Sequence, residues 1–131
     1  IRYPNKDKIY PQDKTISWTI DNFGKLIIPG KKIRIKLNNE NFTLYKQIIR
    51  KFEESELTKM NDIFYINKKS SKHYTFKKNY YFVLGDHRIV SLDSRYWGFL
   101  PEDRIIGKVC YVLFSIKAKK WQKERFLLKI K

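Results

Sequence analysis

The side chains best suited to chemistry gather in one short segment, residues 85–98. It holds two Asp, two Arg, two Ser and one His between two glycines, directly after an apolar run. Functional residues collect in loops held by a rigid scaffold, so this segment is the first candidate site. The spacing of Asp93 and Arg95 suits a local ion pair, and Ser91 could orient a neighbouring base. A hydrogen-bonded structural loop explains the same residues, because a Ser/His/Asp triad is recognised by geometry and not by spacing alone.

The one cysteine of the chain, Cys110, lies inside the apolar run 109–116. A single cysteine permits no internal disulfide and no cysteine zinc site, and we expect neither a metal nor a cofactor. A lone cysteine in an apolar run is a buried small hydrophobe more often than a nucleophile, and we expect this of Cys110. The run is also too short for a membrane span, which needs roughly 18 residues.

Composition bounds the class of protein. With 131 residues the chain has the length of one ordinary domain, and its 42% hydrophobic and 16% aromatic content excludes disorder. Its 29 Lys and Arg against 13 Asp and Glu give a net charge of +16, which is typical of a nucleic-acid or anionic-membrane partner. The charge is spread along nearly every segment, so a solvated surface explains it as well. The chain opens at Ile1 without an initiator Met or a signal peptide, and we expect it to be part of a longer protein.

The elements that must position residues 85–98 are short and mostly β. Residues 31–37 alternate strictly, with Ile33, Ile35 and Leu37 on one face, and predict a half-buried strand. Residues 41–54 place apolar side chains at helical spacing after an N-cap sequence and predict the single clear helix. We expect further strands at 16–20, 62–66, 73–77, 79–84, 105–116 and 126–130. A hairpin tip is expected at 67–72, an irregular lead-in at 1–15 and a polar loop at 86–95, and residues 55–61 are polar. The fold class is therefore mostly β with one short helix.

Segment 85–98 closely resembles the last signature box of the type I signal peptidases, the S26 family of serine proteases. That box is usually written G-D-N-R-x-x-S-x-D-S-R, and this chain has at the same spacing Gly85, Asp86, His87, Arg88, Ser91, Asp93, Ser94 and Arg95. Residues 101–108 resemble the P-x-x-x-I-x-G-K continuation of the box. Upstream, residues 18–29, 44–49 and 74–81 resemble the insert found in signal peptidases of the Bacteroidetes group. The resemblance covers roughly residues 16–116.

The resemblance implies a membrane-bound enzyme that removes signal peptides from exported proteins with a Ser–Lys dyad. Such an enzyme is anchored in the inner membrane with its catalytic domain on the outer, periplasmic face. It implies a signal-peptidase-like, LexA-like β domain, of which this chain would be the carboxyl-terminal portion. Residues 1–78 would be an inserted non-catalytic β-rich region, and residues 79–131 the closing strands of the catalytic domain.

The resemblance also assigns roles within the box by position. Ser91 matches the serine that hydrogen-bonds the base lysine and fixes its orientation. Asp93 and Arg95 match the pair that stabilises the loop around that serine, and Gly85 matches the glycine that lines the pocket of the base. Further members of the box are Asp86, Arg88 and Ser94.

The chain departs from the family pattern where the dyad should be. It has no S-M-x-P-T box for the nucleophile and no R-x-x-G-x-P-G-D box for the base, and its only Met, Met60, is followed by Asn61. We therefore expect the dyad upstream and the chain alone to be inactive. Within the box, His87 replaces the usual Asn, and Ile89 and Val90 replace positions that are often polar.

Two alternatives stay open. A degenerate relative of the peptidases would bind without cutting. A basic β-rich domain of another class would bind nucleic acid or act as a non-catalytic interaction module, whereas the peptidase interpretation expects no nucleic acid. The partners implied by the peptidase resemblance are signal peptides and a membrane surface. Lys68, Lys69 and residues 117–123 would be available to anionic headgroups. An incomplete barrel would expose strand edges, and edge pairing into a dimer is a further expectation.

Overall fold

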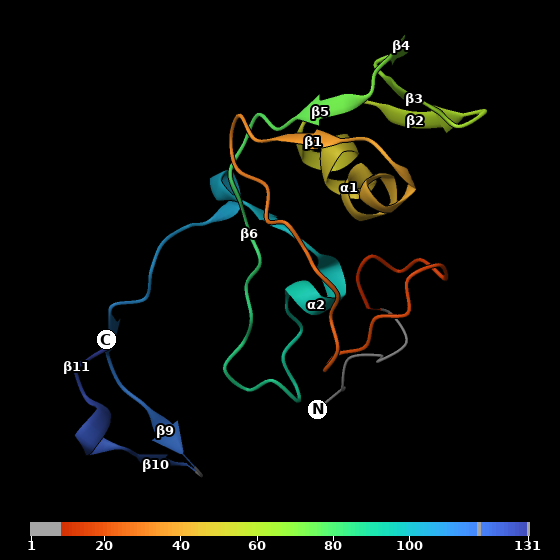
Figure 1. Ribbon diagram of the computed structural model, residues 1–131. Helices are drawn as coiled ribbons and strands as arrows, with labels where there is room; N and C mark the ends of the chain where they lie inside the picture. Colours follow the sequence, from red (N-terminus) through yellow and green to blue (C-terminus); the bar gives the residue numbers. More distant parts are fainter. Residues whose placement is uncertain (1–8, 118, 131) are drawn as a thin grey trace.

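The computed structural model describes residues 9–117 and 119–130 as small antiparallel sheets beside one main helix (Figure 1). β1 (Arg34–Lys36) pairs with β5 (His73–Thr75), and Ile35 lies opposite Tyr74. A three-stranded sheet consists of β2 (Leu57–Met60), β3 (Ile63–Ile66) and β4 (Lys69–Ser70). The expected class, mostly β with one short helix, is confirmed.

Three further strand pairs complete the sheets, each only two residues long on either side. β6 (Tyr80–Tyr81) pairs with β7 (Leu100–Pro101) and frames the loop that contains the candidate site. The other two pairs join β8 (Tyr111–Val112) with β11 (Leu128–Lys129), and β9 (Ile116–Lys117) with β10 (Lys120–Trp121).

The main helix, α1, spans Asn39–Phe52, so it begins and ends two residues before the predicted range 41–54. Its start is fixed by the side chain of Asn38, which accepts a hydrogen bond from the N–H of Asn41 at 2.7 Å. One face of α1 is buried and packs into the main core. That core also draws on β1, β5, β6 and the chain around Phe99, and its members are Tyr10, Ile35, Leu37, Leu44, Tyr45, Ile48, Ile49, Leu57, Tyr74, Phe76, Tyr80 and Phe99.

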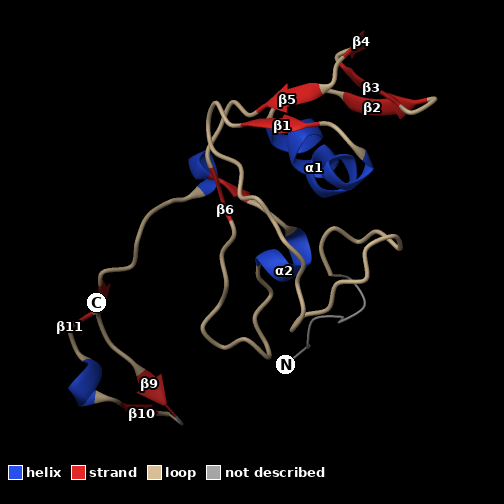
Figure 2. Cartoon of the chain, viewed as in Figure 1, coloured by secondary structure: helices blue, strands red, loops and turns tan. Residues whose placement is uncertain are grey.

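Three single-turn helical elements stand among long loops in the rest of the described chain (Figure 2). α2 (Ser94–Trp97) follows the candidate loop and ends at Gly98, whose φ of 86° lies in the left-handed region that glycine adopts without strain. Two 3₁₀ turns cover Glu102–Arg104 and Lys123–Arg125. Of the irregular lead-in expected over 1–15, residues 1–8 lie outside the described residues, and residues 9–15 form neither helix nor strand.

Several local predictions were wrong. Residues 16–20 form no strand, and β2 lies within the polar segment 55–61, where no strand was predicted. Ile33 is 46% exposed, although Ile35 and Leu37 of the same predicted face are buried. Cys110 is exposed instead of buried, because the extended run around it packs against no core within the described chain. Alternation along a run predicts a strand, but only a partner sheet makes that strand buried.

Residues 105–130 lead away from the core to a small separate unit, which contains β9, β10 and β11 (Figure 1). Its large apolar side chains are strongly exposed, and they are Ile105, Ile106, Val109, Tyr111, Leu113, Phe114, Ile116, Trp121, Phe126, Leu127, Leu128 and Ile130. Monomeric proteins seldom expose so many apolar side chains in one stretch. Across the part of the chain that is described, no helix is long and apolar enough to cross a membrane.

Candidate functional site

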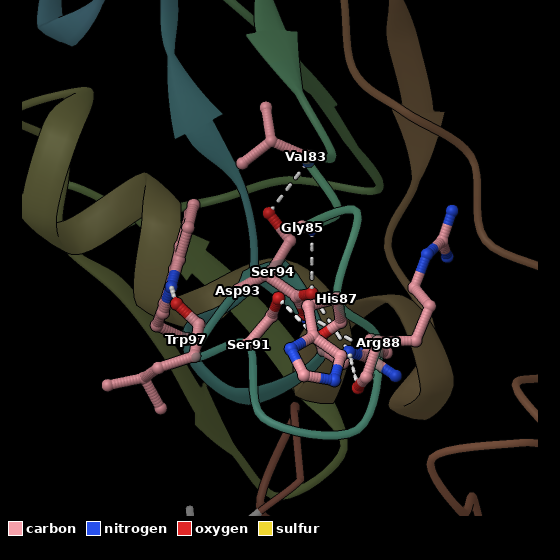
Figure 3. A network of polar contacts seen from close by, with 10 residues as sticks. Val83, Gly85, His87, Arg88, Ser91, Asp93, Ser94 and Trp97 are labelled. Carbon is pink, nitrogen blue, oxygen red and sulfur yellow. Dashed lines mark hydrogen bonds and ion pairs between the residues drawn. The ribbon is translucent and has the colours of Figure 1, made fainter. Parts of the chain in front are cut away.

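The candidate site is the loop between β6 and β7, which is closed at its neck by Val83 and Ser94. The N–H of Val83 donates to Ser94 Oγ at 2.9 Å, and the N–H of Ser94 donates to the carbonyl of Val83 at 3.0 Å. Figure 3 shows this neck, with the bond between Gly85 and Asp93 just beyond it. Ser94 is fully buried, so its hydroxyl serves loop closure.

The carboxylate of Asp93 accepts four hydrogen bonds, from Gly85 and Arg95. Its Oδ1 accepts from Arg95 Nε at 2.9 Å and from the Arg95 N–H at 3.2 Å. Its Oδ2 accepts from Arg95 Nη2 at 2.9 Å and from the Gly85 N–H at 3.0 Å. The expected ion pair is thus confirmed, and it has the two-point geometry in which a guanidinium holds a carboxylate most firmly. Arg95 Nη2 also donates to the carbonyl of Arg88 at 2.6 Å, which ties the far side of the loop to the pair.

Electrostatics keeps this pair charged. Burial by itself raises the pKa of Asp93, but the hydrogen bonds from Arg95 and Gly85 outweigh it and hold that pKa below its ordinary value. The hydrogen bond to Asp93 raises the pKa of Arg95, against the effect of burial. At neutral pH the loop therefore contains a closed, fully ionised pair.

Ser91 packs directly on Gly85. A Cβ at Gly85 would lie 2.6 Å from the Cβ of Ser91 and nearer still to its Oγ, so no other residue fits without moving the loop. Ser91 Oγ donates to the carbonyl of His87 at 2.8 Å, and the Ser91 N–H donates to the same carbonyl at 3.0 Å. After donating, a hydroxyl oxygen keeps two lone pairs, so this half-buried Oγ can accept a hydrogen bond from a lysine brought to it.

The remaining box members stay at the surface. The side chains of Asp86, His87 and Arg88 are exposed, and that of Arg88 points away from the network (Figure 3). Their main chain stabilises the turn, since the Arg88 N–H donates to the carbonyl of Asp86 at 3.1 Å. The structure therefore brings together five of the seven predicted site residues, which are Gly85, Ser91, Asp93, Ser94 and Arg95.

An open cleft of about 770 Å³ borders the loop. One wall is the N-terminal segment with Trp18 and Asp21, and the other is the loop with Arg88, Ile89 and Arg95. Trp18 is half-buried and packs against Phe23 with ring centres 5.2 Å apart. The cleft thus combines apolar side chains with both charges beside the ion pair.

One buried acid was missed from the sequence. Glu53 is 2% exposed and accepts hydrogen bonds from the segment that leads into β6. Its position was the available signal, because it lies four residues after Ile49 and so continues the apolar face of α1. As for metals, the described residues contain no group of three or more His, Cys, Asp or Glu side chains that could hold an ion.

Comparisons with known proteins agree with the box. A family model described as "Signal peptidase, peptidase S26" matches residues 18–114. A signal peptidase I of Buchnera aphidicola subsp. Baizongia pistaciae is 35% identical over 128 residues, which cover 90% of this chain and 40% of that protein. A signal peptidase I of Haemophilus influenzae is 49% identical over 57 residues, which cover 39% of this chain and 16% of that protein. No solved structure matches significantly.

The box loop and these matches define the class. The chain belongs to the signal peptidase family, peptidase S26, and it is homologous to signal peptidase I, a serine endopeptidase. The matched part spans less than half the length of these relatives.

Proposed function

We propose that this chain is the carboxyl-terminal portion of a signal peptidase I that removes signal peptides from exported proteins. The observation that supports this most directly is the loop 83–95, in which a buried Asp93–Arg95 pair and Gly85 hold Ser91 in place. The Ser–Lys dyad would lie in a preceding segment, and the chain alone would not cleave peptides.

In this proposal the chain supplies the support for the base. A lysine entering beside Gly85 would donate to Ser91 Oγ, whose own proton already points to the carbonyl of His87. That hydrogen bond would fix the lysine toward the nucleophilic serine, and burial would keep it neutral and basic. Asp93 and Arg95 would act through the loop and not on substrate.

The division of the chain is part of the same proposal. Residues 1–78 would form the inserted non-catalytic region, and residues 79–131 would provide closing strands of the catalytic β domain. The pattern of residues 18–29 and 74–81 supports an insert of the Bacteroidetes type. In the fold, β6 begins just after this boundary and pairs with β7, and the loop between them is closed by Val83 and Ser94.

The parent enzyme would be anchored in the inner membrane with this portion on the outer face. Segment 105–130 supports a membrane partner, because its exposed Ile116, Trp121 and Phe126 stand among lysines and arginines. Aromatic and basic side chains together favour the headgroup region of an anionic bilayer. Pairing of the exposed edges of β8–β11 with a second copy would give the dimer expected of an incomplete barrel.

The first test is the gene upstream of Ile1. We expect a membrane span, then a Ser-Met box, then a lysine box. An initiator codon shortly before Ile1, with neither box, would refute an active peptidase. A degenerate relative would retain the span but lack the serine or the lysine.

The second test is a substitution in the full-length enzyme. Ser91→Ala should lower kcat for signal-peptide cleavage by roughly 10- to 100-fold, the usual cost of losing a group that orients a catalytic residue. Ser71→Ala is the matched control, because Ser71 also donates to a nearby main-chain carbonyl, at 2.7 Å, but lies in the proposed insert. Equal activity of both variants would contradict the role of Ser91.

The charge of +16 favours nucleic-acid binding as the second candidate function. Binding of that kind weakens linearly in log K as log salt rises, with one released counterion per phosphate neutralised. A titration of the chain with single- and double-stranded oligonucleotides at two salt concentrations separates the candidates. Micromolar binding with a steep salt slope would favour this alternative.

A further inference from the structure

The carboxylate of Glu53 is the most deeply buried acid outside the box loop. Glu53 occupies the C-cap position of α1, where the helix dipole disfavours a negative charge. Its side chain is almost completely withdrawn from water. A buried carboxylate in this position is costly unless every lone pair is used, so its contacts indicate what it does.

The carboxylate of Glu53 accepts four hydrogen bonds, and all of them come from residues 74–80. Oε2 accepts from the hydroxyl of Tyr74 at 3.0 Å and from the N–H of Lys77 at 2.7 Å. Oε1 accepts from the hydroxyl of Tyr80 at 2.8 Å and from the N–H of Lys78 at 3.2 Å. The ammonium of Lys77 bonds elsewhere, to the carbonyl of Glu53 at 2.9 Å and to Ser55 Oγ at 3.2 Å. The carboxylate is thus held by neutral donors and fixes one short segment from four points.

Residues 76–79 connect β5 to β6, and the box loop follows directly after β6. Tyr80 pairs with Pro101 in the β6–β7 ladder. Three residues later Val83 closes the loop neck with Ser94, and Gly85 then donates to Asp93. A shift of β6 would therefore move the N–H groups of Val83 and Gly85 away from their acceptors, and the loop around Ser91 would loosen.

We propose that Glu53 is a positioning residue, which fixes β6 and through it the contacts of Gly85, Asp93 and Ser91 in the box loop. Glu53 lies in the proposed insert, so the insert would help to keep the box loop with Ser91 ordered. The importance for catalysis rests on the proposed function, whereas the coupling between Glu53 and the loop is a property of this chain and can be measured without any activity.

Glu53→Gln separates hydrogen bonding from packing, because the two side chains have nearly the same shape. Each carboxylate oxygen faces one main-chain N–H, so either orientation of the amide turns its NH₂ toward Lys77 or Lys78. A tyrosine hydroxyl can rotate to accept from that NH₂, but a main-chain N–H cannot. One N–H of this part-buried contact thus loses its acceptor in either orientation.

The experiment is hydrogen exchange of the 131-residue chain followed by NMR. In Glu53→Gln, the N–H groups of Val83 and Gly85 should exchange roughly tenfold faster or more, because the loop neck opens more often. The matched control is Glu54→Gln, a neighbouring exposed acid, which should leave these rates unchanged. The N–H groups of the β2–β3 pair report global unfolding, and they should keep their rates in both variants.

Two further variants keep the test decisive if Glu53→Gln does not fold. Tyr80→Phe and Tyr74→Phe each remove one hydroxyl from the same carboxylate, but only Tyr80 lies in β6. We expect faster exchange at Gly85 in Tyr80→Phe than in Tyr74→Phe. Unchanged exchange at Val83 and Gly85 in Glu53→Gln, or equal effects of the two tyrosine variants, would overturn the coupling.

A kinetic measurement tests the catalytic importance separately. In the full-length enzyme, Glu53→Gln should lower kcat for signal-peptide cleavage and leave KM unchanged, because the loop supports the base and does not bind substrate. A faster loop exchange without any change in kcat would keep the coupling and refute the link to the proposed function.

Discussion

Removal of the Asp93 carboxylate is the sharpest test of how the box loop is held. In Asp93→Ala, Arg95 keeps its charge but loses its two-point partner, and the Gly85 N–H loses its acceptor. The two side chains of the pair are only 6% and 7% exposed, so water does not replace the lost contacts. Loss of one partner from a buried pair costs about 3–5 kcal/mol, because the other charge is left uncompensated. This is a large share of the roughly 5–15 kcal/mol that stabilises an ordinary domain.

The assay is urea unfolding of the chain followed by circular dichroism, with Asp103→Ala as the matched control. Asp103 pairs with Lys78 at 2.7 Å, but these side chains are 52% and 36% exposed, so its removal should cost about 0–1 kcal/mol. Adding Arg95→Ala to Asp93→Ala should restore part of the loss, because no unpaired charge then remains. Equal losses in Asp93→Ala and Asp103→Ala, or a double variant less stable than Asp93→Ala, would refute the interpretation of the pair.

Three other outcomes are expected. The folded state lowers the pKa of Asp93 below its ordinary value of 3.8, so the stability that this residue contributes is present above pH 4 and is lost as pH falls further; an unfolding series from pH 6 to pH 2 should show a shallower loss in Asp93→Asn than in the parent chain. Gly85→Ala should cost about 1–3 kcal/mol in urea unfolding because its Cβ meets Ser91, whereas Gly107→Ala, with nothing within 4 Å, should stay within about 0.5 kcal/mol. Trp121→Ala should weaken sedimentation with anionic vesicles more than Trp97→Ala does, since Trp121 is 59% exposed and the indole N–H of Trp97 is bonded to Leu92 within the loop; equal binding would count against the proposed membrane surface.

The contacts that were predicted well are close in sequence. The Asp93 carboxylate bonds to residues two and eight positions away. The spacing of Gly85, Asp93 and Arg95 in the sequence therefore determines most of the contacts in the loop. The same holds for α1, whose buried face repeats at helical spacing, and for β3 beside its hairpin turn. A pattern read along the chain is sufficient where the folded contacts also run along the chain.

The contacts that were missed are distant. Glu53 bonds to Tyr74 and Tyr80, which lie 21 and 27 residues further on. No local pattern shows which donors will meet a carboxylate at a helix end, because the meeting depends on how α1 packs against β5 and β6. Cys110 illustrates the converse, since its apolar run predicts burial but the described residues supply no sheet to cover it. Whether an apolar run is buried depends on the other elements that pack on it, and the run alone does not determine these.

The box loop is therefore preorganised in an unusual sense for a chain proposed to lack the reacting groups. All four hydrogen bonds to the Asp93 carboxylate originate from Gly85 and Arg95, and Ser91 bonds within the same loop. The arrangement therefore needs no nucleophile or base to exist. A lysine that arrives from a preceding segment would meet a serine already fixed and would not have to order it, which lowers the entropic cost of assembling the site. The apolar side chains of 105–130 show the opposite behaviour, because they are left exposed by the described chain. The hydrogen bonds of the box loop are therefore complete within this chain, whereas the apolar side chains of 105–130 need a further surface to cover them.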